Sequence, residues 1–133
     1  MTTVYFLNCI AGNVFGSASV PSIPSAYYIG LSTTQPNANG TNVTEPASAG
    51  GYARVRLNSI GNPQNGAVTN TSAISFNEST SSWGVVTHFV VYDAATGGNL
   101  LMYGELTSPR TVDAATTIAI KPGDLSLTVQ NHS

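Results

Sequence analysis

Charged side chains are scarce in this sequence. Asp, Glu, Lys and Arg make up 8% of its 133 residues, against about 25% in an average globular protein. The four basic residues are Arg54, Arg56, Arg110 and Lys121, and the net charge is −2. Because binding phosphates takes clusters of Lys and Arg, this balance argues against a nucleic-acid partner. Sparse charge also means weak self-repulsion, so the protein tolerates close packing against copies of itself.

Cysteine, long apolar runs and a charged N-terminus are also lacking. The one cysteine, Cys9, excludes an internal disulfide. It lies in an apolar stretch with no base nearby, which indicates a small buried side chain rather than a nucleophile. No apolar run reaches the ~18–20 residues of a membrane span, so we expect no membrane partner. The N-terminus has no Lys or Arg, and synthesis in a cytoplasm without a signal peptide is expected. N-x-[ST] sequons at Asn39, Asn42, Asn70 and Asn77 are attributed to chance.

Motifs for catalysis or metal binding are missing. His88 alternates with Val86 and Val90 on one face of a predicted strand. It is either a general base or, as an alternative, a partly buried or interface histidine with a satisfied hydrogen bond. His132 lies next to the C-terminus. No nucleophile–base motif, metal-ligand spacing or phosphate-binding loop is present, so we predict no enzyme, no cofactor and no metal site. The carboxylates are scattered and mostly near turns: Glu45, Glu78, Asp93, Glu105, Asp113 and Asp124.

The sequence is rich in strand signals. Its strongest is a hairpin that pairs residues 85–92 with residues 100–106 across the polar turn 93–99. We expect Thr107–Pro109 to end this hairpin. Phe89 and Val91 are predicted on one face of its first strand, and His88 and Val90 on the other.

Shorter strands surround the hairpin. In the segment Tyr52–Leu57, alternation places Ala53, Val55 and Leu57 on a buried face, and Tyr52, Arg54 and Arg56 on a polar face. A loop as long as Thr33–Gly51 without secondary structure usually has a function or contacts another part of an assembly. The pattern predicts an all-β fold, an antiparallel β-sandwich or jelly roll with a short N-terminal helix. The remaining strands are expected at residues 26–32, 67–69, 73–76, 116–120 and 125–129.

The N-terminal 25 residues carry no charge. Residues 4–15 are predicted to form a short helix, capped by Thr2 or Thr3 and ended by Gly16, although a strand over Val4–Leu7 is an alternative. Its apolar spacing of three and four is formed by Val4, Leu7, Ala11, Val14 and Phe15. We therefore divide the chain into residues 1–25, an apolar helical segment and linker that could act as a docking element, and residues 26–133, a β-sandwich domain.

One stretch resembles a known family. Trp83–Leu101, with the sequence WGVVTHFVVYDAATGGNLL, closely resembles a segment of small virion proteins of tailed bacteriophages that carry the label tail fibre. Tyr27–Pro36, Glu45–Arg54, Ala73–Phe76 and Leu125–Val129 match in order as well, so that the resemblance spans residues 26 to 130. It implies a protein made in the host cytoplasm and located in the virion.

Three functions follow as hypotheses. The first is a structural component of a phage particle, in the tail-fibre region or decorating the capsid surface. Its partners would be other virion proteins and copies of itself, and trimers are common among such proteins. The alternative is a module that binds a host-surface glycan, and a hydrolase of surface polymers has almost no support. The residues predicted to make interface or glycan contacts are Tyr28, Tyr52, Arg54, Trp83 and His88, although Trp83 is otherwise a core or corner residue.

Overall fold

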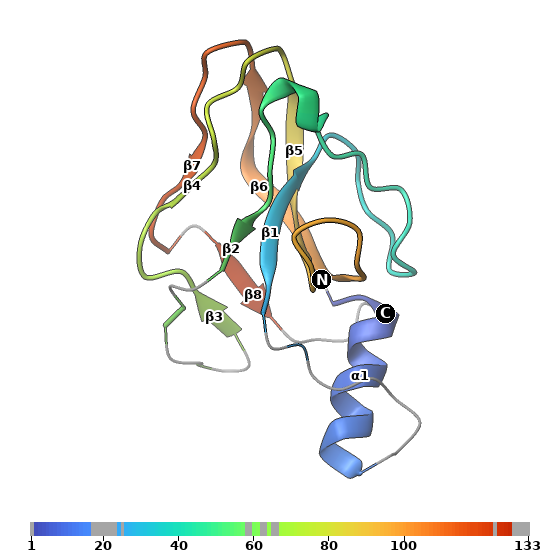
Figure 1. The fold of residues 1–133 in the computed structure, drawn as a ribbon. Coiled ribbons are helices and arrows are strands. Elements are labelled where there is room, and N and C mark those ends of the chain that lie inside the picture. The colour runs from blue at the N-terminus through green and yellow to red at the C-terminus, as the bar shows by residue number, and fades with distance from the viewer. Residues whose placement is uncertain are drawn as a thin grey trace.

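The chain folds into antiparallel β-sheets with an α-helix at its N-terminal end (Figure 1). The computed structural model describes residues 2–16, 24, 26–57, 60–61, 64, 67–123 and 125–128. Every strand pair in that part of the chain is antiparallel. The predicted all-β class with a short N-terminal helix is confirmed. The elements are α1 (Val4–Phe15), β1 (Tyr28–Ser32), a 3₁₀ helix (Ser48–Gly50), β2 (Val55–Arg56), β3 (Ala67–Thr69), β4 (Ile74–Ser75), β5 (Gly84–Tyr92), β6 (Leu100–Val112), β7 (Ala119–Ile120) and β8 (Ser126–Thr128).

A four-stranded sheet in the order β2-β1-β5-β6 forms the larger layer. The predicted hairpin is its β5–β6 pair, and β5 is an inner strand between β1 and β6. Phe89 and Val91 point into the main core, whereas Val90 belongs to a separate cluster on the opposite face. The predicted division is confirmed for Phe89, Val90 and Val91. Val86, predicted on the face of His88 and Val90, lies in the main core instead, because the register shift between Val86 and His88 interrupts the alternation.

Strand β6 is longer than the sequence predicts. It continues through Pro109 to Val112, although Pro109 was expected to end the hairpin. Val86 pairs with Arg110 and His88 with Glu105, so four residues of β6 bulge opposite one residue of β5. Pro109 lies in that bulge, where its missing N–H removes no ladder hydrogen bond. The expectation failed because proline excludes regular pairing but not a bulge within a longer strand.

The smaller layer is a bent two-stranded ribbon. One arm of the ribbon contains β3 and then β4, and the other contains β7 and then β8. β3 pairs with β8, and β4 pairs with β7. Asn70 lies between the two pairs and is 2% exposed. Its Oδ1 accepts hydrogen bonds from the N–H groups of Gly123 and Leu125, both at 3.0 Å. Its Nδ2 donates to the carbonyls of Ser72 and Lys121 at 3.0 and 2.9 Å. The side chain of Asn70 therefore supplies the hydrogen bonds that the ladder loses at the bend.

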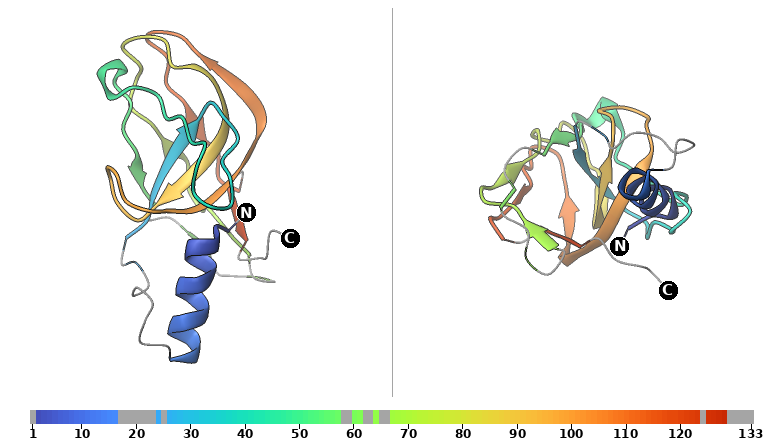
Figure 2. Two further views of the ribbon diagram at one scale, coloured as in Figure 1. Left: turned by 90° about the vertical axis from the view of Figure 1, so that its right-hand side faces the viewer. Right: turned by 90° about the horizontal axis from the view of Figure 1, so that it is seen from below.

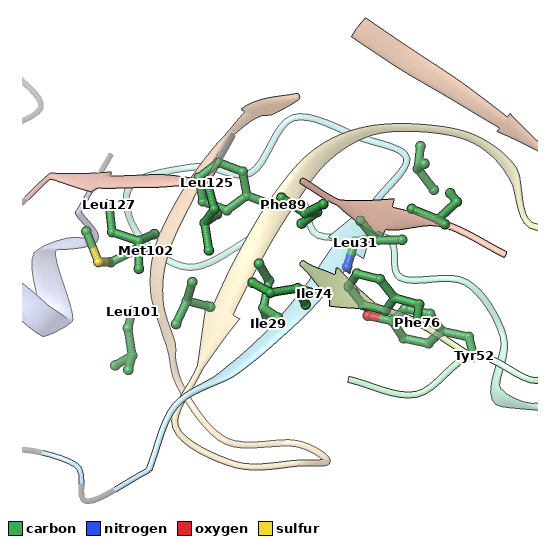
Figure 3. Close-up of a cluster of buried hydrophobic side chains, with 14 of the residues drawn as sticks. Ile29, Leu31, Tyr52, Ile74, Phe76, Phe89, Leu101, Met102, Leu125 and Leu127 are labelled. Atoms are coloured by element: carbon green, nitrogen blue, oxygen red, sulfur yellow. Dashed lines mark hydrogen bonds between the residues drawn. The ribbon is translucent and has the colours of Figure 1, made fainter. Parts of the chain in front are cut away.

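The main core lies between the sheet and the ribbon (Figure 3). The sheet contributes Ile29 and Leu31, both 0% exposed, together with Phe89. The ribbon contributes Ile74 and Leu125, which belong to the same buried cluster. Each fully buried aliphatic side chain of this kind contributes about 1.5–3 kcal/mol. This shared core holds the two layers together.

Helix α1 is tied to the sheet at its first turn and projects away from it (Figures 1 and 2). Thr2 bridges to Met102, and the N–H of Thr3 donates to the carbonyl of Leu101 at 2.9 Å. The hydroxyl of Thr3 also accepts from the N–H of Phe6 at 3.3 Å. Gly16 ends the helix with φ 79°. The predicted helix and both of its caps are confirmed.

The face of α1 that packs against the core is not the one that the apolar spacing indicates. Phe6, Cys9 and Gly12 are its buried residues. Of the predicted stripe, Val4, Val14 and Phe15 are 43%, 69% and 85% exposed. Ala11 is exposed too, and Leu7 is half-buried. The stripe stays largely outside the core, because the tie to β6 turns the other side of the helix inward.

Candidate functional site

The long loop between β1 and β2 folds back over the outer face of the larger sheet. The N–H of Thr33 donates to the carbonyl of Thr44 at 2.9 Å, and the N–H of Thr44 donates to Ser32 Oγ at 3.2 Å. Val43 packs against a second buried cluster that consists of Val90, Tyr92, Leu100 and Tyr103. The loop therefore covers the sheet, and it places Glu45, two residues after Val43, above the sheet.

Glu45 and Arg54 form an ion pair with two hydrogen bonds. Arg54 Nη2 lies 2.6 Å from Glu45 Oε1, and Arg54 Nε lies 2.9 Å from Glu45 Oε2. The Arg54 side chain is 7% exposed and that of Glu45 is 21% exposed. The pair is therefore largely desolvated. Removing either partner would leave an uncompensated charge in a desolvated position, which is strongly destabilising.

Arg54 also fixes the turn between β5 and β6. Its Nη1 donates to the carbonyls of Ala94 and Gly97, both at 2.8 Å. Its guanidinium lies 3.6 Å from the ring centroid of Tyr92, a cation–π contact. The four hydrogen bonds to Glu45 and to the turn use four of the five guanidinium N–H donors. Arg54 thus joins the loop, β2 and the turn into one unit.

Tyr52 connects this ion pair to the core. Its hydroxyl donates to Glu45 Oε2 at 2.5 Å and accepts from the N–H of Leu31 at 3.0 Å. The hydroxyl lies directly over Gly30, where a Cβ would overlap it. Glycine is therefore required at position 30 for the close approach of Tyr52 to β1.

Burial and Glu45 set the ionisation of this cluster. Burial raises the pKa of Tyr52 far above its ordinary value, and the hydrogen bond to Glu45 raises it further. Burial alone lowers the pKa of Arg54, but the hydrogen bonds and charge of Glu45 more than offset this effect, so its net pKa is raised. Tyr52 remains a hydroxyl donor and Arg54 a cation. We name the cluster of Glu45, Tyr52, Arg54 and Tyr92 the Arg54 cluster.

An open pocket of about 400 Å³ borders the Arg54 cluster. It is lined by Glu45, Tyr52 and Arg54 on one side and by turn residues on the other. The other lining residues are Pro46, Ser48, Ala53, Ala95, Thr96 and Gly97. Most donors and acceptors of the cluster bind each other or the turn rather than pointing into this pocket. The main role of the cluster is therefore to hold the β1–β2 loop and the β5–β6 turn together.

The structure brings some of the predicted contact residues together. Tyr52 and Arg54 meet at Glu45, and Trp83 packs edge-on against Tyr52 with ring centroids 5.5 Å apart. Trp83 is 6% exposed, and its indole N–H donates to the carbonyl of Gly50 at 2.8 Å. It is a core residue, the second of the two roles expected for it. Tyr28 is half-buried on β1, where it pairs with Tyr92.

The placing of Tyr52 on a polar face was wrong. Tyr52 is 7% exposed and belongs to the main core, and Ala53, predicted to be buried, is exposed. The alternation fails because the strand covers only Val55–Arg56, so the residues before it are outside the ladder. Sequence reasoning also missed Glu45 and Tyr92, since no local spacing links a loop carboxylate to an arginine nine positions later.

His88 lies apart from the Arg54 cluster. It is half-buried on β5, paired with Ser32 of β1 and Glu105 of β6. Its Nδ1 is 2.7 Å from the hydroxyl of Thr87. Burial lowers the pKa of His88, and the negative charge of Glu105 opposes this shift. The geometry is that of a hydrogen-bonded strand residue. His132 is outside the described residues.

A second candidate surface is the side of α1 that faces away from the core. We call it the outer face of α1 and define it as Val4, Leu7, Ala11, Val14 and Phe15. Because successive helical residues are rotated by about 100°, these five residues lie opposite the buried Phe6 and Cys9. Val14 and Phe15 are the most exposed large apolar side chains of the described chain. The outer face is therefore an apolar surface open to a partner.

No group of three or more His, Cys, Asp or Glu side chains is placed to hold a metal ion in the part of the chain that the structure describes. None of the helices described there has the length and hydropathy to cross a membrane.

Comparison with known proteins gives the class of this chain as a phage fibre protein. A family model described as podophage GP4 fiber I protein gp80 matches residues 2–128. The match covers α1 and all of the described strands, and the chain belongs to this family. Its description agrees with the resemblance found in the sequence. Among curated proteins, none matches the chain.

Proposed function

We propose that this chain is a structural subunit of the fibre of a podophage, and that it acts through assembly with other virion proteins and with copies of itself. The family match over residues 2–128 carries the proposal. The apolar outer face of α1, with Phe15 at 85% exposure, supports a role in protein–protein contact. The family description favours the fibre over a place on the capsid surface.

Particles test this proposal directly. Antibodies raised against the purified chain should label the fibres of intact virions in electron micrographs, and mass spectrometry of purified particles should detect its peptides. Labelling confined to the capsid surface would move the protein to a decoration role. Absence of its peptides from infectious particles would refute a structural role.

A glycan-binding role is the second candidate, and the pocket beside the Arg54 cluster favours it. The pocket combines apolar Ala53 and Ala95 with the hydroxyls of Ser48 and Thr96. Sugar rings present the same mixture of apolar faces and hydroxyl groups. Such a ligand would be a short stretch of host-surface glycan.

Filling the pocket tests this candidate. Ala53→Trp would occupy it and replaces none of the residues that contact Arg54, and Ala73→Trp is a matched control at an exposed position outside its lining. If the pocket binds glycan, the Ala53 variant alone should lose binding on an array of host-surface glycans. Equal binding by both variants, or none by the wild type, would remove this candidate.

A further inference from the structure

The outer face of α1 has the spacing of a helix–helix contact. Val4, Leu7, Ala11 and Val14 follow each other at intervals of three, four and three residues. These are the a and d positions of a heptad repeat, which face a partner helix in coiled coils. Phe15 lies beside them and is 85% exposed. The opposite side of the helix is already used, because Phe6 and Cys9 are buried in the main core.

Helix α1 has apolar residues on both sides, and Asn8 and Asn13 are the polar residues on its exposed part. Residues 2–16 contain no charged side chain, whereas the solvent side of a surface helix normally carries charged and polar residues. An exposed stripe of large apolar side chains normally marks a contact surface. In α1 the β-sheets cover one side only, and Figure 2 shows the helix extending beyond them. The outer face is therefore available for a contact outside the chain's own core.

We propose that the partner on the outer face is α1 of a second copy of this chain. This inference rests on the proposed function and names the surface through which copies meet. The absence of charge on residues 2–16 favours an identical partner, because two such helices meet without like-charge repulsion. A charged partner surface would find no complementary group there. Ala11 lies in the middle of the stripe, where a small side chain lets two helices approach closely.

The contact is small by the standards of stable complexes. A helix of 12 residues is about 18 Å long, and its outer face alone cannot supply the roughly 1,200–2,000 Å² of a standard interface. We therefore expect concentration-dependent self-association of the purified chain, strengthened in the fibre by whatever else holds the copies together. Measurements must extend to high protein concentration.

The first experiment places a charge on the outer face. Val14→Lys places an unpaired cation in the apolar contact of the complex, while in the monomer Val14 is 69% exposed and lysine suits a helix C-terminus. Val85→Lys is the matched control, since Val85 is 46% exposed on β5. Sedimentation should show that Val14→Lys weakens association at least about tenfold, with unchanged Tm. Val85→Lys should associate like the wild type.

The second experiment captures weak contacts covalently. Cys9 is buried, so an introduced thiol is the accessible one. Because the outer faces of the two copies meet, Ala11→Cys should form a disulfide-linked dimer under mild oxidation. The matched variant Ala73→Cys, exposed on the smaller layer, should stay largely monomeric. Added Val14→Lys should suppress the crosslink at Ala11→Cys.

The outcomes separate this inference from the proposed function. A wild type that stays monomeric at all concentrations, with crosslinking at Ala11→Cys no greater than at Ala73→Cys, overturns self-association through α1. Association that Val14→Lys leaves unchanged overturns it as well. In both cases the detection of the protein in virion fibres would leave the proposed function intact. Self-association through α1 in a protein absent from particles would refute the proposed function alone.

Discussion

Replacing Arg54 with methionine should destabilise the fold, whereas the same change at Arg56 should not. Arg54 lies just before β2 and Arg56 lies within it, but the Arg54 side chain is 7% exposed and Arg56 is exposed. Arg54→Met keeps an unbranched apolar stem. It removes the ion pair with Glu45 and the two hydrogen bonds to the turn carbonyls.

The magnitude follows from burial. Removing one partner of a buried ion pair costs about 3–5 kcal/mol. Because Glu45 keeps 21% of its side-chain exposure and retains the hydrogen bond from Tyr52, we take the lower end, about 3 kcal/mol. For a chain of 133 residues that corresponds to a fall in Tm of about 10 °C. Arg56→Met should stay within about 0.5 kcal/mol of the wild type.

Urea unfolding provides the assay. The single tryptophan, Trp83, is 6% exposed and packs against Tyr52, so its fluorescence reports on this region. Hydrogen exchange should also show faster exchange of the turn residues 94–98 in Arg54→Met. If Arg54→Met and Arg56→Met have equal unfolding free energies, the Arg54 cluster is not a stabilising latch and the reasoning fails.

Three further predictions concern other parts of the fold. Asn70→Asp should lower the free energy of unfolding by at least about 2 kcal/mol. In the variant a carboxylate oxygen faces the carbonyls of Ser72 and Lys121, to which Nδ2 donates in the wild type. Urea unfolding at pH 7 measures this change, and Asn77→Asp at an exposed position is the control. Gly30→Ala should cost about 1–3 kcal/mol, because its Cβ would overlap the Tyr52 hydroxyl, and the double variant with Tyr52→Phe should recover part of this loss in the same assay. Because burial lowers the pKa of His88 below its ordinary 6.5, the unfolded state binds the proton more readily, so stability should fall as the pH drops through 6.5 toward the lowered value. Unfolding free energies at pH 7.5 and 5 should therefore differ less in His88→Gln than in the wild type, and an unchanged difference would contradict the assigned shift.

Most of the fold could be predicted because its determinants are local. The turn 93–99 contains Gly97 and Gly98 at φ 61° and 76°, conformations that glycine adopts without strain. Alternation in β5 was readable over His88–Tyr92, where the strand pairs with β1 without a register shift. Two-residue strands such as β2 carry no usable alternation, which is why Tyr52 was misplaced. The bulge around Pro109 was hidden because it depends on the register of a distant strand.

The Arg54 cluster could not be predicted, because its members are joined only by tertiary structure. Glu45 reaches Arg54 after the loop folds across the sheet, and Tyr92 arrives from the far end of β5. The predicted contact residues Tyr52 and Arg54 do lie together, but their polar atoms are directed mainly at each other and at Glu45. Residue type indicated that they were important, and only the geometry indicates what they hold together.

Helix α1 shows that a correct periodicity does not determine what the apolar face contacts. Its three-and-four spacing identifies a helix and an apolar face, but a helix with two apolar faces leaves open which one meets its own domain. Thr2 and Thr3 decide this by pairing with β6, which fixes the rotation of the helix and turns Phe6 and Cys9 inward. The face with the more regular spacing is then left outside. In an isolated domain the outer face of α1 would leave apolar surface in contact with water, whereas in a fibre subunit the same face is available for assembly. The residues that best predict the helix are therefore the ones that we expect to carry the contact between copies.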